Sequence, residues 1–529
     1  MTLPQAMQLA EQCKSQGKLA EAEGIYRQIL AAAPGLAAAL NHLGIVVGER
    51  DRLSEARDLF QQAVDAEPKY FDAWSNLGLA CERLDDVDRA IAARRKAIEL
   101  RADGAEQWHR LGVCLAKRGD VKDAIDTLKK SLDLNPLVEG IRHDLILALC
   151  KDNQHSAARD VIFAVPPGKL PGAATIKLVT DGMKTLGRFD EATEIWGRVL
   201  ELNPSDGEAR GQWAMCLITM GDFERGWREY EARWFCDTFE ANKRLDPRRQ
   251  WGLPPIGHPD VAGKTILLYS EQGVGDVIQF ARYASIFAQR GARIIMQCPW
   301  SLKSLMETCT GVRLVYAENE ELPSYDWHIP LMSLPLALGT TPQNIPAEVP
   351  YLRADPARCK IWQTRVQSAT AAASRVRVGL AWAGNPKHKN DQNRSIDPAG
   401  LPELAKVEGV AFFSLQKSKE NKKAVPPPGL ELIDFTQSLN DFAETAAFLE
   451  QLDLVISVDT AVAHLAGALA RPVWTLIPFV PDFRWYLRGD DTAWYPTMRL
   501  FRQESYGRWT PVIEKIAQQL RNEVEKKIR

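Results

Sequence analysis

A 34-residue interval between small residues is the feature that most constrains how this chain can fold. Alanine recurs in one register from residue 22 to residue 192, and proline follows four of these alanines after 12 residues. A proline cannot continue the hydrogen-bond ladder of a helix, and a small residue lets two helices cross closely. The pattern predicts stacked helix pairs that form a superhelix. The residues that carry it are Ala22, Ala56, Ala90, Ala124, Ala158, Ala192, Pro34, Pro68, Pro136 and Pro204.

The first helix of each pair carries a second signature. Trp74 and Trp108 stand near its start in two repeats, and Leu-Gly pairs follow at 77–78 and 111–112. This pattern resembles the tetratricopeptide repeat, and we expect about seven repeats within residues 1–236. We expect the tryptophans to pack in the core. The resemblance implies a concave face that binds an extended protein partner, and self-association through the repeats is a further option.

The chain has a similar layout to the cytoplasmic O-linked acetylglucosamine transferases, whose concave face carries a ladder of asparagines. The matching positions here hold mixed residue types, so no such ladder is expected, and any partner would make mixed polar contacts. These positions are Gln8, His42, Asn76, Arg110, Asp144, Leu178 and Gln212.

Composition excludes several classes of protein. The 529 residues are 45% hydrophobic and 25% charged, which is ordinary for soluble domains. A net charge of -2 provides no global positive field for nucleic acid. We find no leader-like N-terminus and no membrane-spanning window, and therefore predict a cytoplasmic protein without a transmembrane segment. The nine cysteines are scattered without a C-x-x-C pair, which predicts reduced thiols and no zinc site.

The hydrophobic pattern changes after the repeats. Residues 237–262 are rich in Pro, Gly and basic residues and are expected to be a connector. Short apolar runs then alternate with helices, which predicts two open parallel sheets facing a cleft, over 263–357 and 358–510. We call these two regions the first half and the second half. Residues 511–529 are predicted to form an amphipathic helix that packs back on the first half. Strands are expected at 264–269, 292–298, 312–316, 327–331, 376–382, 411–415, 431–435, 453–458 and 472–477.

Three segments at predicted strand ends could carry chemistry. The turn after the first strand holds Gly273, Gly275 and Asp276, where the glycines would allow a tight turn and Asp276 could be a helix cap or a general base. Asp459 and Thr460 open a helix that contains Ala461 and His464. Such a helix start suits a diphosphate, although these residues could equally be a cap and a core histidine.

The third segment follows the first strand of the second half. Its cations would either form a solvated turn or neutralise a leaving pyrophosphate at the edge of the sheet. Gln416 and Lys417, which follow the next strand, would lie at the same edge. The cations are Lys387, His388, Lys389 and Arg394.

Together the three segments resemble the heptosyltransferase-like glycosyltransferases of family 9, over roughly residues 262–510. Gly275-Asp276-Val277-Ile278 is similar to the Gly-Asp-Val-Ile turn of that family, and Asp459-Thr460-Ala461 with His464 is similar to its Asp-Thr-Gly-x-x-His motif, with Ala461 in place of glycine. The resemblance implies the two-domain GT-B fold, with residues 263–357 as the acceptor side and 358–510 as the nucleotide-sugar side. It also implies that Asp276 is the catalytic base, and it places Arg394 loosely at a donor-site cation.

The whole chain resembles bacterial tetratricopeptide-repeat glycosyltransferases, including those that modify surface or flagellar proteins. We expect an inverting transfer of sugar from a nucleotide-activated donor to a hydroxyl acceptor, without a metal or other cofactor. Asp86-x-Asp88, the one Asp-x-Asp sequence, lies in a repeat turn. Two alternatives stay open: a non-enzymatic repeat scaffold with a nucleotide-binding region, and transfer to a lipid-linked or other saccharide.

Overall fold

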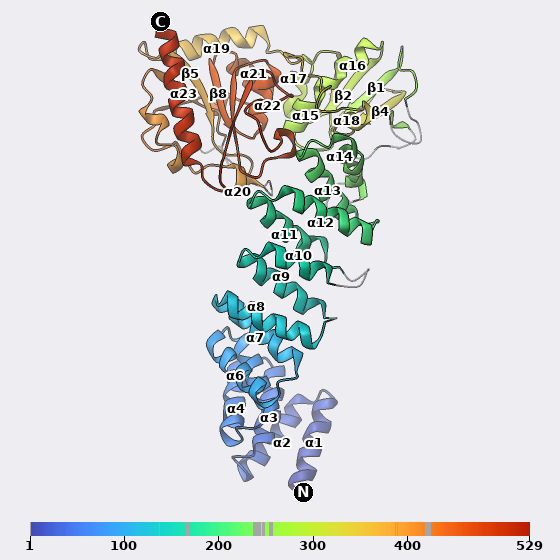
Figure 1. Cartoon of the computed structure of the whole chain (residues 1–529), viewed down its shortest axis with the longest axis vertical. Coiled ribbons are helices and arrows are strands. Elements are labelled where there is room, and N and C mark those ends of the chain that lie inside the picture. The colour runs from blue at the N-terminus through green and yellow to red at the C-terminus, as the bar shows by residue number, and fades with distance from the viewer. Residues whose placement is uncertain are drawn as a thin grey trace. The chain divides into compact units, whose positions relative to one another are not determined.

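The computed structural model describes residues 2–136, 138–164, 170–235, 245, 249–252, 258–386, 388, 390–417 and 425–528. The chain forms two compact units, residues 1–183 and 184–529. Each unit is described by itself below, and Figure 1 gives the labels of their elements. Most of the predicted connector lies outside the described residues.

The first unit consists of consecutive helices that pack in pairs. The repeat alanines Ala22, Ala56, Ala90, Ala124 and Ala158 are almost fully buried, as expected for closely crossing helices. The elements are α1 Leu3–Ser15, α2 Leu19–Ala32, α3 Ala37–Glu49, α4 Leu53–Ala66, α5 Phe71–Arg83, α6 Val87–Leu100, α7 Ala105–Arg118, α8 Val121–Leu134, α9 Glu139–Lys151, α10 His155–Phe163 and, reaching into the second unit, α11 Ala173–Thr185.

The signature residues of the first helices have structural roles. A Cβ atom at Gly112 would lie 2.6 Å from the Leu128 side chain, so only glycine lets α7 and α8 approach so closely. The indoles of Trp74 and Trp108 pack against the core and donate hydrogen bonds to the carbonyls of Pro68 and Ala102. Both observations agree with packing roles for these residues.

The second unit begins with the last helices of the repeat series and continues as two parallel sheets (Figure 1). The repeat helices are α12 Phe189–Leu202, α13 Gly207–Thr219 and α14 Phe223–Tyr230, followed by the 3-10 helix η1 Glu231–Phe235. The first sheet has the order β3-β2-β1-β4. Its strands are β1 Thr265–Tyr269, β2 Arg293–Cys298, β3 Val312–Ala317 and β4 Trp327–Pro330.

The second sheet has the order β10-β9-β8-β5-β6-β7, and all its strand pairs are parallel. Counted from its first strand this is the order 3-2-1-4-5-6 of a doubly wound nucleotide-binding fold. The last strand, β10, was not predicted, because arginines interrupt its apolar pattern. The strands are β5 Val376–Ala381, β6 Val410–Ser414, β7 Leu432–Asp434, β8 Leu454–Val458, β9 Val473–Ile477 and β10 Met498–Arg502.

The C-terminal helix α23 (Thr510–Ile528) packs on the second sheet. The prediction that it packs on the first half was wrong. Its Ile513, Ile516 and Leu520 are buried in one cluster with Val378 of β5 and Phe501 of β10, because those strands present an apolar face that needs a cover. Among the described residues, every helix is too short or too polar to cross a bilayer.

Candidate functional site

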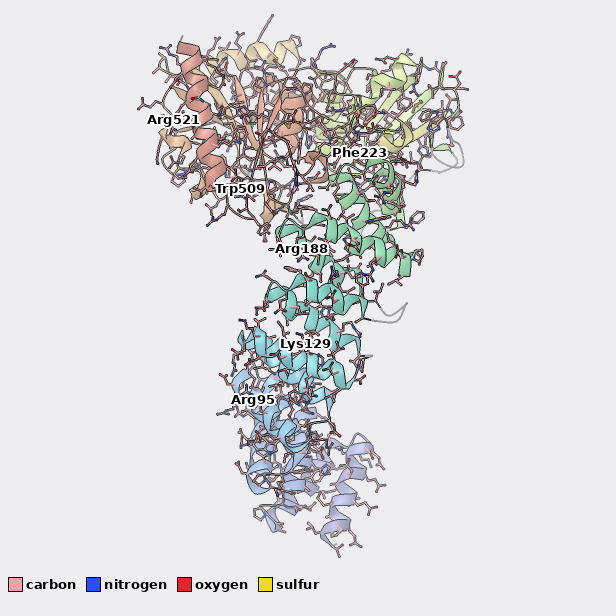
Figure 2. All side chains as sticks on the ribbon, in the orientation of Figure 1. Arg95, Lys129, Arg188, Phe223, Trp509 and Arg521 are labelled. Atoms are coloured by element: carbon pink, nitrogen blue, oxygen red, sulfur yellow. The ribbon has the colours of Figure 1, made fainter. Side chains whose placement is uncertain are left out.

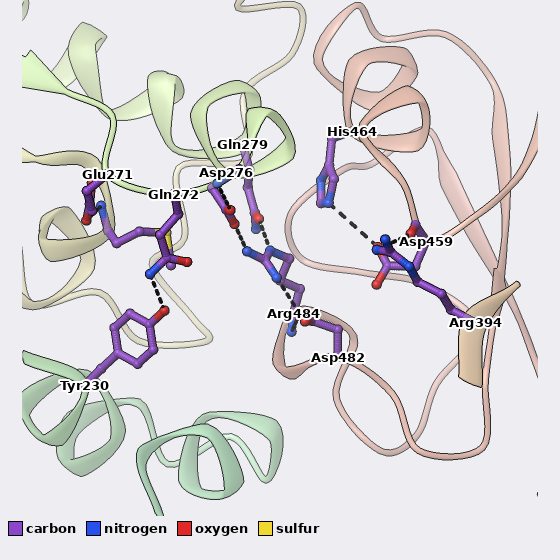
Figure 3. A network of polar contacts seen from close by, with 12 residues as sticks. Tyr230, Glu271, Gln272, Asp276, Gln279, Arg394, Asp459, His464, Asp482 and Arg484 are labelled. Atoms are coloured by element: carbon purple, nitrogen blue, oxygen red, sulfur yellow. Dashed lines mark hydrogen bonds and ion pairs between the residues drawn. The ribbon is translucent and has the colours of Figure 1, made fainter. Parts of the chain in front are cut away.

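The strand order of the second sheet reverses between β5 and β8, and ligands of open parallel sheets bind beyond the carboxyl ends of the strands at such a reversal. Two predicted segments meet there. Arg394 ends the short helix α20 (Asp391–Arg394) in the loop after β5, and Asp459 follows β8. The Arg394 guanidinium donates to the Asp459 carbonyl at 2.9 Å (Figure 3). The fold therefore joins residues that are 65 positions apart in the sequence.

Helix α22 (Ala461–Ala468) begins beside this contact. Thr460 precedes it in an extended conformation, and its hydroxyl pairs with Ser457 at 2.9 Å instead of capping the helix. In the described part of the chain, no hydrogen-bond acceptor is seen for the amides of Ala461 and Val462. These amides and the positive end of the helix dipole are suited to hold an anion.

His464 lies one turn into α22 and is buried. Its Nδ1 is 3.0 Å from the Tyr495 hydroxyl, and its ring stacks on Trp485. Burial, with the positive charges of Arg282 and Arg394, lowers the pKa of His464 to about 3. The imidazole is therefore neutral near pH 7, and it can act at this site as a hydrogen-bond donor but not as a cation.

Replacing His464 with glutamine is expected to reduce the loss in free energy of unfolding that occurs when the pH falls. A histidine whose folded pKa is about 3 and whose unfolded pKa is near 6.5 stabilises the protein above pH 6.5, and this contribution is lost as the pH falls toward 3. Between pH 7.5 and pH 5 the loss amounts to about 2 kcal/mol in the unsubstituted protein. Urea unfolding of both proteins at these two pH values measures it, and an equal pH dependence in His464→Gln would contradict the assignment.

Asp276 lies near the start of α15 (Val274–Phe280), beside the second half. Its Oδ2 accepts a hydrogen bond from the Gly273 amide at 3.0 Å, and its Oδ1 forms an ion pair with Arg484. Arg484 belongs to the 3-10 helix η11 (Phe483–Trp485), which follows β9. The same guanidinium donates to Gln279 and to Asp482, each at 2.6 Å (Figure 3). The Asp276 carboxylate thus caps the start of α15 and also contacts Arg484 of the second half.

Arg484 was not among the predicted site residues, although in the structure it is one of the links between the two halves. The sequence around Arg484 gives little indication of a functional role, because the arginine stands between Phe483 and Trp485 in a segment that is typical of an aromatic core. Its partner Asp276 is 208 positions away. Only the tertiary structure brings them together, and they are in contact where sequence analysis places a cleft.

The acidic groups at this junction are strongly perturbed. Burial and the nearby charge of Asp459 raise the pKa of Asp482 to about 8. Burial also raises the pKa of Asp459, against the opposing effects of Trp485 and Arg394. Burial lowers the pKa of Arg484 to about 10. Such a concentration of shifted groups is typical of a functional site.

The glycines of the Asp276 turn have a different role from the predicted one. Neither Gly273 nor Gly275 has a positive φ, so the turn itself does not demand glycine. A Cβ at Gly275 would lie 3.3 Å from the His464 ring and 3.7 Å from the Ala461 backbone. Gly275 therefore permits the close approach of α15 to α22, which are in contact across the two halves.

Other predicted residues lie at the edge of this arrangement. The Gln416 side chain accepts hydrogen bonds from the amides of Trp382 and Ala383, and so it braces the loop that leads to Arg394. The exposed Lys417 donates to the Leu439 carbonyl. Lys387 and Lys389 lie outside the described residues. In the described part of the chain, no group of three or more His, Cys, Asp or Glu side chains could hold a metal ion.

Comparison with protein families separates the chain into two parts. Tetratricopeptide repeat models match residues 43–105 and 105–137. The model of glycosyltransferase family 9 (heptosyltransferase) matches residues 436–478, a segment that contains Asp459, Thr460, Ala461 and His464. Different parts of the chain therefore match the tetratricopeptide repeat models and the glycosyltransferase family 9 model. Asp276 and Arg394 lie outside the matched residues of this family 9 segment.

Individual proteins are similar to parts of the chain. Protein FlbA of Caulobacter vibrioides is 26% identical over 341 residues, which is 58% of this chain and 54% of FlbA. The chain thus spans about half the length of this curated relative. Among solved structures, YrrB, a TPR protein with an unusual peptide-binding site, is 18% identical, and the match covers 39% of this chain and 88% of YrrB with a TM-score of 0.29. Pseudomonas aeruginosa pilF is 18% identical, and its match covers 39% of this chain and 95% of pilF with a TM-score of 0.30.

Proposed function

We propose that this protein is a glycosyltransferase that moves a sugar from a nucleotide-activated donor to a hydroxyl group of a polypeptide. The observation that carries the proposal is the strand-order reversal of the second sheet. There Arg394 and the start of α22 offer positive charge and amide donors for a phosphate, and Asp276 lies opposite. In this proposal residues 358–510 bind the donor and residues 263–357 face the acceptor.

The proposed reaction is a single displacement with inversion. The acceptor oxygen forms a bond to the anomeric carbon while the bond from that carbon to the phosphate oxygen breaks. Asp276 takes the hydroxyl proton. Negative charge grows on the departing nucleoside diphosphate, and Arg394, Arg484 and the α22 amides stabilise it. These arginines supply the charge that a metal ion would otherwise provide, so transfer is expected to persist in EDTA.

A row of exposed apolar side chains supports a polypeptide acceptor. Leu79, Val113 and Leu147 are 39%, 40% and 39% exposed and stand 34 residues apart on α5, α7 and α9, with the half-buried Ile45 of α3 in the same register. One exposed leucine is ordinary, but a core does not require the recurrence of several at one register. We call these four residues the apolar row.

The spacing of the apolar row indicates what it would bind. The row lies on alternate helices of the series, of which α3 contacts α5 and α7 contacts α9, and packed helices lie about 8–10 Å apart. An extended polyproline-type chain has three residues per turn and rises about 9 Å over them, so every third side chain points the same way. We therefore expect an acceptor segment with an apolar residue at about every third position.

Glutamate at Leu79, Val113 and Leu147 together is expected to abolish transfer to a polypeptide while leaving donor turnover to water or a small acceptor unchanged. The reason is that charges replace the apolar contacts far along the chain from the catalytic residues. The matched control is Leu9→Glu with Val138→Glu, two apolar side chains of similar exposure that do not share a 34-residue register. Equal loss in control and test variants would contradict the role of the apolar row.

The two rivals make different predictions. A non-enzymatic scaffold would bind a nucleotide without releasing product, and an enzyme acting on lipid-linked or other saccharides would be insensitive to the apolar row. The deciding experiment incubates the full chain with a panel of nucleotide-activated sugars and follows release of nucleoside diphosphate or monophosphate, with and without candidate acceptor proteins. Acceptor-dependent diphosphate release is the expected result. If no donor gave nucleotide release, the proposal would be overturned. Release of a nucleoside monophosphate would mean that the amides at the start of α22 do not hold a diphosphate leaving group.

A further inference from the structure

The first sheet has its own strand-order reversal, and a side chain of the repeat series fills it. The order reverses between β1 and β4, so the loops after these two strands border a crevice of the kind that holds ligands in open parallel sheets. Glu271 follows β1, and Ser333 lies in the 3-10 helix η6 (Leu331–Ser333) after β4. Arg233 of η1 reaches both, donating to Glu271 at 3.0 Å and to Ser333 at 2.8 Å.

This contact is buried and most of its polar atoms are paired, although among the described residues Arg233 Nε and Glu271 Oε2 have no hydrogen-bond partner. The Arg233 and Glu271 side chains are 5% and 0% exposed. Glu231 accepts from Arg233 at 2.6 Å and from Ser333 at 2.7 Å, and the Met332 amide donates to Glu271 at 3.1 Å. Burying two opposite charges is expensive, and a hydrophobic pair would often stabilise a fold equally well. The Arg233–Glu271 contact ties the loop after β1 to η1, and removing one partner would leave the other as an uncompensated buried charge.

A second contact reaches the same loop. The Gln272 amide donates to the Tyr230 hydroxyl of α14 at 2.7 Å (Figure 3). Glu271 and Gln272 immediately precede the turn that carries Asp276. Tyr230 of α14 and Arg233 of η1 belong to the last repeat, by which we mean α13, α14 and η1. They thus hold the loop that leads from β1 to Asp276, the proposed base.

The last repeat also contacts the segment that carries Arg484. Trp227 packs edge-on against Phe483 with ring centroids 5.7 Å apart. Phe223, labelled in Figure 2 at the start of α14, stacks on Tyr486 at 5.9 Å. Phe483 and Tyr486 flank Arg484 in the sequence. One repeat therefore touches both of the loops whose charged residues, Asp276 and Arg484, meet at the site.

We propose that the last repeat is a working part of the active site, in which Arg233 and Tyr230 are positioning residues for the Asp276 turn. Arg233 also occupies the crevice of the first sheet, which leaves the crevice of the second sheet to the nucleotide. The inference rests on the proposed transferase function for its kinetic consequence. Its structural consequence, an Asp276 turn held rigid by the repeat, does not depend on that function.

The test compares two charge-neutralising double variants of the full chain. Arg233→Gln with Glu271→Gln removes the charge pair at the Asp276 loop and leaves uncharged polar side chains in its place. The matched control is Arg94→Gln with Glu82→Gln, which neutralises a 2.7 Å Arg-Glu pair, with Arg94 likewise buried, in the first unit. Hydrogen-deuterium exchange of residues 270–280 and the kinetics of transfer are measured for both.

Faster exchange at residues 270–280 is expected only in the Arg233 variant, with kcat lowered about 100-fold and the donor KM unchanged, since a displacement near 1 Å costs this much in rate. Tyr230→Phe, which removes a single hydroxyl and preserves packing, is expected to lower kcat about tenfold. Unchanged exchange and kcat in a folded Arg233 variant would overturn the proposal. Faster exchange in a protein that turns over no donor would retain the positioning role and reject the transferase.

Discussion

Replacing Asp276 with asparagine is expected to lower the rate of sugar transfer about 10²- to 10⁴-fold while leaving donor affinity nearly unchanged. The amide has the shape of the carboxylate and can still accept from the Gly273 amide, but it cannot take the proton of the acceptor. Arg484 keeps its hydrogen bonds to Gln279 and Asp482, so the junction is expected to stay folded. Transfer is measured by product release, and donor affinity by calorimetry with a nucleoside diphosphate.

The control for this variant is Asp355→Asn. Asp355 also caps a helix, α19 (Pro356–Ala369), by accepting from the amides of Ala357 and Arg358, but it lies away from the proposed site. It is expected to leave transfer intact. If Asp276→Asn transfers sugar at the unsubstituted rate, Asp276 is a helix cap and not the base.

Replacing Arg394 with glutamine is expected to lower kcat/KM for the donor about 10²- to 10³-fold and to weaken binding of the nucleoside diphosphate. The guanidinium lies at the strand-order reversal, hydrogen-bonded to the Asp459 carbonyl next to the first amides of α22. Its positive charge would act in a partly buried setting, where a charge-assisted contact with a phosphate is strong. Arg394→Lys should recover only part of the loss, because an ammonium group cannot bond the carbonyl and the phosphate with the same planar geometry.

The matched control is Arg499→Gln. Arg499 lies on β10 of the same sheet and donates to Gln519 of α23, away from the strand-order reversal. Its replacement is expected to leave donor kinetics unchanged. An Arg394→Gln protein with normal diphosphate affinity would remove this arginine from the donor site and leave the α22 amides as the remaining candidate.

Local patterns in the sequence predicted most of the elements. The 34-residue period anticipated the helix pairs, because every repeat meets the same packing requirement at its alanine. Nine strands were anticipated from apolar runs, whereas β10 and the packing partner of α23 were not. The latter depends on which face of a sheet is left uncovered, and no local pattern encodes that.

The candidate site divides in the same way. Asp276, Asp459, Thr460 and His464 stand at strand ends that the sequence makes visible. The roles of Arg484 and Arg233 depend on partners that are distant in the sequence. Arg484 contacts Asp276, 208 positions away, and Arg233 contacts Glu271, 38 positions away.

The repeat period, the parallel strands and the residues at their carboxyl ends follow from the sequence, because they depend on helix and strand periodicity over short stretches of chain. The tertiary structure alone decided the strand order, and with it the reversal that places Arg394 beside Asp459. It also decided that Arg233 contacts the loops after β1 and β4 and that Arg484 contacts Asp276 across the two halves. A buried charged side chain needs a partner of opposite charge, and for Arg233 and Arg484 that partner comes from a loop that is distant in the sequence. Which loops come together depends on the packing of the whole unit, and the sequence pattern of a single segment does not encode it.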